Sequence, residues 1–384
     1  MSQVIGVSAE EPKSRPAIRP ERTVRATGSG PASTLLRVPD LRSLGWLAPD
    51  GDHLPPGTRP GRVARVDRGL LTVLTEDGDR RVRPASARHD PTGLATPVVG
   101  DWVAVRGELA VAVLPRRSAF VRTAAGRTST AQAVAANLDL VLVVEALAGA
   151  PRLRRVERYL AVAWSSGATP VVVLTKADLC GDVPAAIGHV AEDAPGVQVL
   201  AVSAVSGDGV DDVRSLLSPG RTAVMVGPSG VGKSSLANAL AGRIVAVTSD
   251  VRDGDGRGRH TTTARDLHVL PGGGLLVDTP GMRELAVHDG DAGVAAAYAD
   301  VEELGTRCRF RDCGHRGEPG CAVAEALADG RLDLGRFVGW RKLAAEAQRQ
   351  QLRADTRARA LEKARLKARY RAVRTQPNRE RPGR

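Results

Sequence analysis

The spacing of apolar residues changes along this chain and divides it into parts of different character. Residues 1–34 are polar, carry Pro and Gly and show no periodicity, which predicts a flexible arm. A short helix is expected at 35–47, and a linker leads to residue 58. Five short apolar runs then alternate with turn signals such as Asp77-Gly78-Asp79. Strands are expected at 62–66, 70–74, 80–82, 102–105 and 109–114.

Five strands in so few residues predict a small β-barrel over residues 59–122. The pattern fits an OB-type barrel, and an SH3-like barrel would give the same spacing. OB-type barrels bind single-stranded nucleic acid through aromatic platforms and basic grooves. This stretch has few aromatic residues, so an RNA-binding role would depend on phosphate contacts from Arg62, Arg65, Arg80 and Arg81. A purely structural barrel fits the composition equally well.

From Ala131 onward, continuous apolar runs alternate with amphipathic stretches. This alternation is typical of α/β proteins, in which buried parallel strands are covered by helices. The pattern stops after Gly281. Strands are expected at 138–144, 170–174, 197–203, 222–226 and 274–277, and helices at 153–165, 183–191, 210–217 and 234–241.

The strongest motif is Gly227-Pro-Ser-Gly-Val-Gly-Lys-Ser234, which follows an apolar strand and opens a helix. It matches the phosphate-binding loop, in which glycines turn backbone N–H groups toward phosphates and a Lys contacts the β- and γ-phosphates. The Ser hydroxyl would bind Mg²⁺. A chance match in a glycine-rich chain is the alternative, and the strand–helix context disfavours it. The expected phosphate contacts are Gly227, Pro228, Ser229, Gly230, Val231, Gly232, Lys233, Ser234 and Ser235.

A second strand ends in Asp278-Thr-Pro-Gly281, a D-x-x-G sequence. Asp278 would hold Mg²⁺, and the Gly281 N–H would sense the γ-phosphate of a bound nucleotide. By itself this sequence is a common turn. Paired with a phosphate loop, it indicates a nucleotide switch.

A third strand ends in Thr175-Lys-Ala-Asp178. A carboxylate at Asp178 can accept two hydrogen bonds from the N1–H and amino group of guanine, which adenine does not offer. Lys176 would lie along the base plane, with Ala177 between them. Ser203 and Ala204 end another strand, and their backbone N–H groups would face the guanine O6. All these strand ends lie at the edge where open α/β sheets bind ligands, so we expect GTP and GDP to bind there.

The base-reading motif precedes the phosphate loop, whereas ordinary GTPases have the opposite order. This order resembles the circularly permuted GTPases, and in particular the bacterial ribosome small subunit-dependent GTPase A family. The resemblance covers residues 59–340 and depends on AVAANLD, GPSGVGKSS, GRHTTT, the D-x-x-G sequence and a Cys/His cluster. Many members of this family have Asn where this chain has Thr175. A hydroxyl replaces a carboxamide there, so guanine affinity is expected to be weaker and guanine specificity to be kept through Asp178.

The catalytic residues are less evident, because Met282 stands where many GTPases have a water-orienting Gln. The resemblance implies that the charged, glycine-rich stretch 252–263 is the first switch. Thr262 would close over Mg²⁺, and His260 would position the attacking water. An exposed His without a role is the alternative reading of His260. We expect slow intrinsic GTP hydrolysis that the ribosome stimulates.

Three of the four cysteines fall within fourteen residues, in the spacing C-x4-C-x-H-x5-C. Three thiolates and one imidazole complete a tetrahedral Zn²⁺ site without an open position, which predicts one structural zinc ion. Free thiols or a disulfide are the alternatives. The expected ligands are Cys308, Cys313, His315 and Cys321. Cys180 stands apart and is expected to have no role.

Charge is concentrated at the C-terminus. The chain has 55 Lys and Arg against 43 Asp and Glu, a net charge of +12, and residues 341–384 contribute +11 of it. Such a tail indicates a polyanionic partner, here RNA, although a solvated surface helix would have a similar composition. Residues 341–371 contain no Gly or Pro and predict a helix. No apolar run approaches the ~20 residues that span a bilayer, and the N-terminus lacks a signal sequence.

These patterns combine into one prediction of organisation and function. The segments are an arm and linker (1–58), an OB-type barrel (59–122), a circularly permuted α/β GTPase domain (131–287), a helical zinc-binding domain (288–340) and a basic helix with a disordered tail (341–384). We expect a cytoplasmic, monomeric GTPase, without a membrane partner, that binds the small ribosomal subunit and its rRNA. GTP hydrolysis would accompany late subunit maturation and release. A GTPase of large-subunit assembly and a nucleotide-gated RNA-binding module with negligible turnover are the alternatives.

Overall fold

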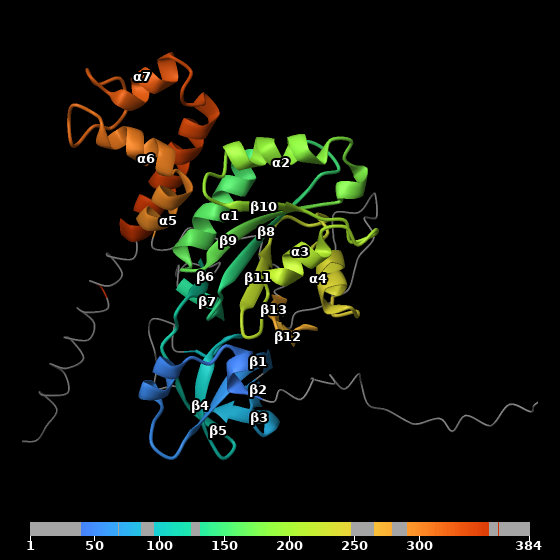
Figure 1. Ribbon diagram of the computed structural model, residues 1–384. Helices are drawn as coiled ribbons and strands as arrows, with labels where there is room; N and C mark the ends of the chain where they lie inside the picture. The colour runs from blue at the N-terminus through green and yellow to red at the C-terminus, as the bar shows by residue number, and fades with distance from the viewer. Residues whose placement is uncertain are drawn as a thin grey trace, which may run out of the picture. The chain divides into compact units, whose positions relative to one another are not determined.

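The computed structural model describes residues 40–67, 69–85, 96–123, 131–246, 265–278, 290–352 and 360 (Figure 1). Two short 3-10 helices, η1 and η2, begin the described chain. Of the helix expected at 35–47, the described part is helical over Leu41–Leu44 only, because Gly45 ends it in the left-handed conformation (φ +84°). Residues 35–39 lie outside the described part. The bounds are η1 Leu41–Leu44 and η2 Ala48–His53.

Five strands form a closed barrel. They follow the order β1-β2-β3-β5-β4, and β1 also pairs with β4 and so closes the sheet. The β3–β5 pair is parallel and the others are antiparallel. This is the topology of an OB-type barrel and decides against the SH3-like alternative. The strands are β1 Arg59–Asp67, β2 Leu70–Thr75, β3 Gly78–Pro84, β4 Trp102–Arg106 and β5 Leu109–Val113.

An alanine-rich hairpin follows the barrel and was not expected from the sequence. Strands β6 (Ala119–Thr123) and β7 (Ala131–Ala136) pair with each other as a two-stranded sheet, and Ala135 of β7 forms a single bridge to Val99. Alanine has a low preference for strands, so the pattern of small residues gave no strand signal. The hairpin connects the barrel to the next domain.

The second domain has a mostly parallel sheet in the order β10-β9-β8-β11-β13-β12, with β12 antiparallel to β13. Helices α1 and α2 cover one face, and α3 and α4 cover the other (Figure 1). The expected α/β class is confirmed, and strand β12 is an addition. The elements are β8 Leu140–Ala146, α1 Leu153–Ser165, β9 Thr169–Thr175, η3 Ala177–Leu179, α2 Val183–Glu192, β10 Gln198–Ala201, α3 Val210–Ser215, β11 Thr222–Val226, α4 Lys233–Ala241, β12 Asp266–Val269 and β13 Leu275–Asp278.

The barrel and this domain meet at a buried arginine. The Arg62 side chain of β1 is fully buried and donates hydrogen bonds to the carbonyl oxygens of Leu44 (2.8 Å) and Asn137 (2.9 Å) and to the Thr222 hydroxyl (3.1 Å). Its guanidinium also lies 5.3 Å from the centre of the Trp102 ring. The expectation that Arg62 could contact RNA phosphates is therefore wrong: this side chain joins the two domains.

The C-terminal part is helical and packs on α1. Its elements are α5 Gly290–Ala297, α6 Ala299–Thr306, α7 Ala322–Ala328 and a helix over 334–352. A Cβ atom on Gly293 would lie 2.4 Å from the Ala161 carbonyl oxygen, so α5 and α1 approach as closely as glycine allows. None of the described helices is long and apolar enough to cross a membrane.

A second buried arginine joins this C-terminal part to α1. Arg336 donates to both carboxylate oxygens of Asp300 (2.6 Å each) and to Glu157 of α1 (3.1 Å). The Tyr298 hydroxyl donates to the other oxygen of Glu157 (3.0 Å). Both arginine and glutamate are almost completely buried, and Arg158 of α1 pairs with Glu346 beside them.

Candidate nucleotide site and metal centre

The loop between β11 and α4 has the backbone that its glycines allow. Gly227, Gly230 and Gly232 have φ values of +150°, +80° and +94°, which other residues rarely adopt. A Cβ atom on Gly227 would lie 2.3 Å from the carbonyl oxygen of Val144 in β8. The loop therefore turns tightly over the end of the neighbouring strand, and only glycine fits there.

Lys233 is the first residue of α4 and reaches back over this loop. Its Nζ donates hydrogen bonds to the carbonyl oxygens of Gly227 (2.8 Å) and Pro228 (2.6 Å). The ammonium group is thus held over the loop, at the N-terminus of a helix whose partial charge also favours anions. The described loop residues Ser229, Val231, Ser234 and Ser235 complete the predicted stretch. Its geometry fits a polyphosphate.

The end of β9 and the segment after β10 are connected beside this loop. The Ser203 hydroxyl donates to Asp178 (2.6 Å) and accepts from the backbone N–H groups of Val205 and Ser206 (3.2 Å each). The backbone N–H of Ala177 donates to the Val202 carbonyl (3.1 Å). The Asp178 carboxylate is therefore oriented by a side chain that is itself fixed by two amides.

This arrangement differs in detail from the sequence expectation for Ser203. Its backbone N–H donates to the Asp208 carbonyl (2.9 Å) and is thus engaged within the protein. Its hydroxyl is the group that serves Asp178. Sequence reasoning selected the residue for its place at a strand end, and only the turn formed by Ser203–Asp208 shows which of its atoms is used. Lys176, with φ +59°, takes the left-handed backbone that starts the turn carrying Asp178.

Thr175 lies between the base-reading strand and the phosphate loop. Its side chain is buried, and its hydroxyl contacts the carbonyl oxygens of Val231 in the loop and Glu145 in β8 (3.2 Å for Glu145). The residue that departs from the usual Asn of the resembling family thus still bonds to the phosphate loop. The weaker guanine affinity expected for this chain stays a prediction. It concerns the contact of residue 175 with guanine and not its contact with the phosphate loop.

Asp278 ends β13, the strand next to β11, and lies directly opposite Asp266 of β12. Burial raises the pKa of the Asp278 carboxyl, and the charge of Asp266 raises it further, while Lys233 lowers it. Ser234 in the first turn of α4 and Asp278 offer oxygen ligands, the kind that Mg²⁺ prefers. Gly281, Met282, His260 and Thr262 lie outside the described residues.

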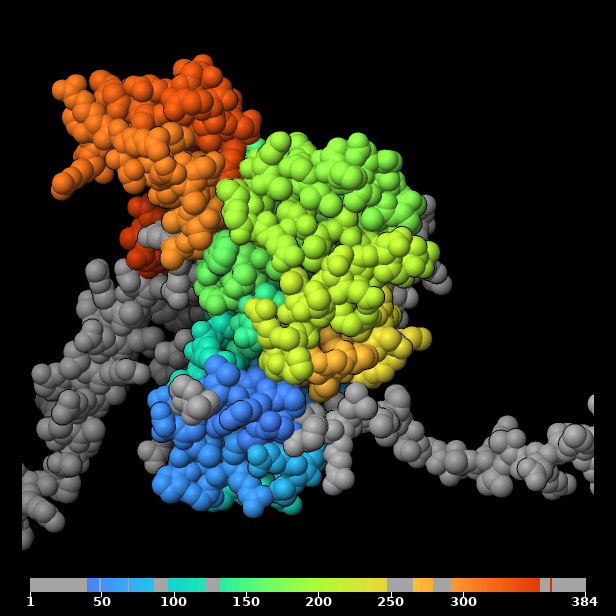
Figure 2. Space-filling model, in the orientation of Figure 1, coloured from blue at the N-terminus to red at the C-terminus, as the bar shows by residue number. Residues whose placement is uncertain are grey.

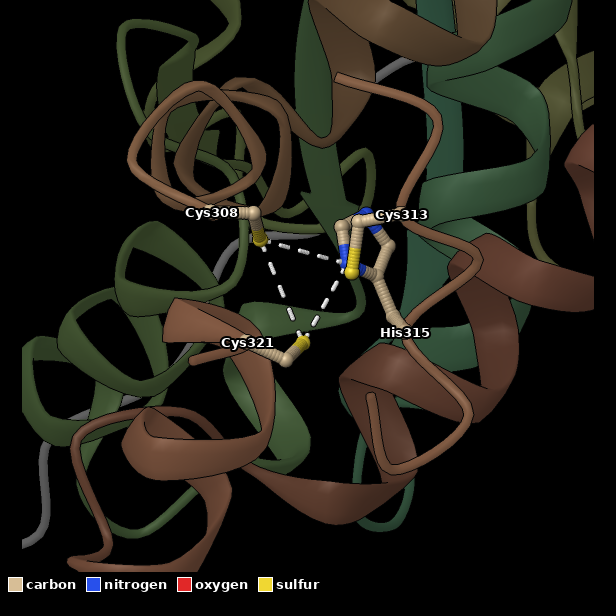
Figure 3. Close-up of side chains that lie close together, drawn as sticks. All are labelled: Cys308, Cys313, His315 and Cys321. Carbon is tan, nitrogen blue, oxygen red and sulfur yellow. Dashed lines mark hydrogen bonds between the residues drawn. The ribbon is translucent and has the colours of Figure 1, made fainter. Parts of the chain in front are cut away.

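The Cys/His cluster is assembled in the structure. The potential ligand atoms of its four residues all lie within 4.8 Å of one another and point toward one centre (Figure 3). Cys308 Sγ is 3.9 Å from Cys321 Sγ, and His315 Nδ1 is 3.6 and 3.5 Å from these sulfurs. Ligands about 2.3 Å from a tetrahedral zinc ion would be separated by such distances, whereas a disulfide needs about 2.05 Å. The cluster therefore fits zinc.

The chain around this cluster is ordered by a carboxylate that sequence reasoning missed. Glu318 accepts hydrogen bonds from the backbone N–H groups of Arg316 (2.6 Å) and Gly314 (3.1 Å). His315 adopts φ +54° between them, and its ring lies 5.5 Å from that of Trp340. Cys321 caps α7 by accepting from the Ala324 N–H. The loop is thus braced on both sides of its histidine.

Comparison with known proteins agrees with this geometry. Residues 113–288 match the family model described as RsgA GTPase. The chain is 47% identical over 333 residues to a small ribosomal subunit biogenesis GTPase RsgA of Streptomyces coelicolor, covering 83% of this chain and 90% of the relative. The chain belongs to the RsgA family of circularly permuted GTPases.

A further relative and two solved structures agree with this match. A relative from Streptomyces avermitilis with the same description is 46% identical over 342 residues, covering 87% of this chain and 91% of its own length. The crystal structure of YjeQ from Thermotoga maritima has 26% identity and a TM-score of 0.56, covering 75% of this chain and 98% of that one. The structure of YloQ, described as a circularly permuted GTPase, has the same fold at 23% identity and a TM-score of 0.55, covering 76% and 96%.

Family membership makes this chain a GTP hydrolase and a nucleotide-binding protein. The order of its elements is the permuted one: the Thr175–Asp178 sequence at the end of β9 precedes the glycine-rich loop after β11, although both lie at the carboxyl edge of one sheet. The barrel, the permuted domain and the helical part with the Cys/His cluster follow one another as the sequence predicted.

Proposed function

We propose that this chain is a GTPase of small ribosomal subunit biogenesis that binds the subunit in its GTP form and leaves after hydrolysis. The observation that carries the proposal is the contact of Asp178 with Ser203, beside a phosphate loop of fitting geometry. The function named for relatives that match more than four fifths of this chain supports the choice of partner.

In this proposal Asp178 accepts from the N1–H and amino group of guanine, while Lys176 covers the base and the Ala204 N–H faces its O6. Residues Gly227 to Ser235 bind the phosphates, and Lys233 leaves the loop carbonyls for the β- and γ-phosphates. Mg²⁺, held by Ser234, Asp278 and Thr262, would neutralise charge that develops on the γ-phosphate. His260 positions the water, and the Gly281 N–H senses the γ-phosphate.

The Cys/His cluster would hold one structural zinc ion, because four protein ligands leave no position open for a substrate. The domain boundaries predicted from the sequence form part of the proposal: 59–122, 131–287, 288–340 and 341–384, after an arm and linker at 1–58. The protein would act as a cytoplasmic monomer.

RNA contact is assigned to the basic C-terminal segment, which holds nearly all of the net charge. Its described part continues the helix that carries Arg336 and presents Arg341, Lys342 and Arg349. The barrel arginines contribute less, since Arg80 and Arg81 are each paired with an aspartate.

The exchange Asp178→Asn tests the nucleotide assignment. An Asn amide can donate a hydrogen bond to the additional carbonyl of xanthine. Toward guanine it can accept only one of the two hydrogen bonds, so one guanine donor is left unpaired. We expect GDP affinity to fall by about a hundredfold or more and XDP to bind in its place. Titration with fluorescent GDP and XDP measures both. Asp211→Asn, on the exposed surface of α3, is the matched control and should change neither affinity.

The partner is tested by GTP turnover measured alone and with purified small or large subunits. Stimulation by the small subunit is the expected result. Stimulation by the large subunit alone would favour the large-subunit alternative. Binding of GTP without turnover under any of these conditions would favour a nucleotide-gated RNA-binding module.

A further inference from the structure

The barrel and the nucleotide domain share one continuous eleven-stranded sheet, joined through a single residue pair. Arg65 of β1 is the residue opposite Asp266 of β12, and it is the one register pair between these strands. The same two residues also form an ion pair, with Arg65 Nε 3.4 Å from Asp266 Oδ1. Backbone pairing and side-chain charge therefore coincide at the point where the two domains meet.

Asp266 is also the residue opposite Asp278 in the antiparallel pair β12–β13. Directly opposed residues of such a pair carry their side chains on the same face, so two carboxylates lie side by side next to the phosphate loop. Like charges in this position repel each other. Arg65, whose Nε lies 3.4 Å from Asp266 Oδ1, is the cation that faces this pair of carboxylates.

The guanidinium group is thus the counter-charge that makes two adjacent carboxylates tolerable. Arg65 and Asp266 together carry no net charge, so the negative charge of Asp278 is not increased by its neighbour. Both Arg65 and Asp266 are part exposed, at 39% and 29% of their side chains. The β12–β13 hairpin reaches the surface in the space-filling view, beside the segment after α4 (Figure 2).

We propose that Arg65 and Asp266 are positioning residues that set the charge beside Asp278 and so the Mg²⁺ concentration needed to hold a guanine nucleotide. This inference rests on the proposed function, in which Asp278 is a Mg²⁺ ligand. It gives the barrel a direct electrostatic influence on the nucleotide site, through residues that touch neither nucleotide nor metal.

The two residues act with opposite signs. Removing the Arg65 charge leaves Asp266 uncompensated, and the added negative charge attracts Mg²⁺ more strongly. Removing the Asp266 charge takes a negative charge from beside Asp278, while Arg65 stays paired with Asp67, and so weakens Mg²⁺ binding. Removing both restores neutrality. If the pair only held the domains together, either single exchange would weaken Mg²⁺ binding at the nucleotide site.

The experiment measures the dissociation rate of fluorescent GDP from the full-length protein as a function of Mg²⁺ concentration. For Arg65→Gln the half-saturating Mg²⁺ concentration should fall by about threefold to fivefold, the size expected for a nearby unit charge in a part-exposed, salt-screened site. For Asp266→Asn it should rise by a similar factor, and the double variant should lie within about twofold of the wild type. Arg65→Lys should keep the wild-type value, since it keeps the charge.

Arg81→Gln is the matched control. Arg81 is a barrel arginine that pairs with Asp67, as Arg65 also does, but lies on β3 away from β12. It should leave the Mg²⁺ requirement unchanged. An unchanged or increased Mg²⁺ requirement for Arg65→Gln would overturn the inference.

GDP affinity in the presence of a chelator separates the two proposals. Equal affinity of all variants without Mg²⁺ shows that they are folded and that the nucleotide site is intact, so a failed charge effect then counts against the Arg65–Asp266 pair alone. If the wild type binds no guanine nucleotide, the proposed function fails instead.

Discussion

The permuted domain is joined to each of its neighbours through a buried arginine, and the two arginines have opposite surroundings. Arg62, at the barrel, donates to two carbonyl oxygens and a hydroxyl, and no described carboxylate forms an ion pair with it. Arg336, at the C-terminal helices, donates to the carboxylates of Asp300 and Glu157. Arg62 is thus surrounded by neutral dipoles and Arg336 by charges.

The surroundings change the two guanidinium groups in opposite directions. Burial, assisted by the nearby charge of Arg117, lowers the pKa of Arg62 to about 10. Burial would also lower the pKa of Arg336, but the hydrogen bonds and charge of Asp300, with the charge of Glu157, outweigh it and raise that pKa. The comparison teaches that the neutral partners of Arg62 tolerate loss of the guanidinium charge, whereas the carboxylate partners of Arg336 depend on that charge.

Zinc removal should produce the largest difference between the junction at Arg336 and the junction at Arg62. Structural zinc contributes about 10–16 kcal/mol in small zinc-finger peptides, and here the cluster packs against the helix that carries Arg336. A strong chelator should therefore unfold the C-terminal helices and release Arg336, while Arg62 stays bound. Hydrogen exchange should show loss of amide protection over 290–352 and retained protection over the barrel.

Cys308→Ser should reproduce the effect of the chelator, because it removes one zinc ligand. Cys180→Ser, which changes the cysteine outside the cluster, is the control and should leave protection unchanged. Equal loss of protection in the barrel and in the C-terminal helices would contradict a zinc effect confined to one junction.

Exchange of each arginine for Met is the next test. Arg336→Met removes the counter-charge of Asp300 and one of the two arginines that pair with Glu157, the other being Arg154, and should lower the free energy of unfolding by about 3–5 kcal/mol. Arg62→Met removes a buried charge together with its bonds and should cost about 1–3 kcal/mol. Urea unfolding followed by tryptophan fluorescence measures both.

Two further variants sharpen the contrast. Adding Glu157→Gln and Asp300→Asn to Arg336→Met should recover much of the lost stability, because the uncompensated anions are gone. Arg331→Met, at an exposed ion pair with Asp329, should have no measurable effect. Equal costs at Arg62 and Arg336 would mean that the nature of the partners does not matter.

The smallest effect is the pH dependence of the charged junction. Burial raises the pKa of Glu157 above its ordinary 4.5, against the influence of Arg154, Tyr298 and Arg336. A raised pKa in the folded state gives a stabilisation that is complete below pH 4.5 and is lost as pH rises through the folded pKa. Glu157→Gln lacks this proton, so the stability of the wild type relative to this variant should decline from pH 4.5 upward. Unfolding free energies at several pH values up to 7 measure the decline, and a constant or growing difference would contradict it.

The elements that the sequence predicted best are those defined by a continuous local signal. Helix Leu153–Ser165 and strand Thr222–Val226 were predicted with their observed bounds, because an amphipathic stretch and an apolar run each end at polar or turn residues. The Cys/His cluster was equally readable, since its ligands lie within one short segment. In each case the determining residues are neighbours along the chain.

What the sequence could not show depends on partners from distant segments. Nothing near Arg62 indicates that it faces Asn137 and Thr222, so its neutral environment was mistaken for an exposed surface. The same holds for Arg336, whose partners come from α1 and α6, and for β12, a short strand between β13 and β1 with a weak alternation. The Ser203 contact with Asp178 was half predicted: both residues were selected, but their hydrogen bond requires the turn after β10.

The order of strands in the sheet also has a consequence for how the chain is made. Strands β8, β9 and β10 are adjacent in space, and they are the first strands of this domain to emerge from the ribosome, after the barrel strands. Strand β11 can then join the free edge of β8, and the β12–β13 hairpin can add beyond it. Up to β11 each addition extends an existing edge, whereas the β12–β13 hairpin has to fit between β11 and the barrel strand β1. The final step returns β12 to β1, among the first strands made, and this long-range contact is the kind that folds slowly. A protein that serves ribosome assembly would thus complete its own sheet only after strands β8 to β13 have all been synthesised.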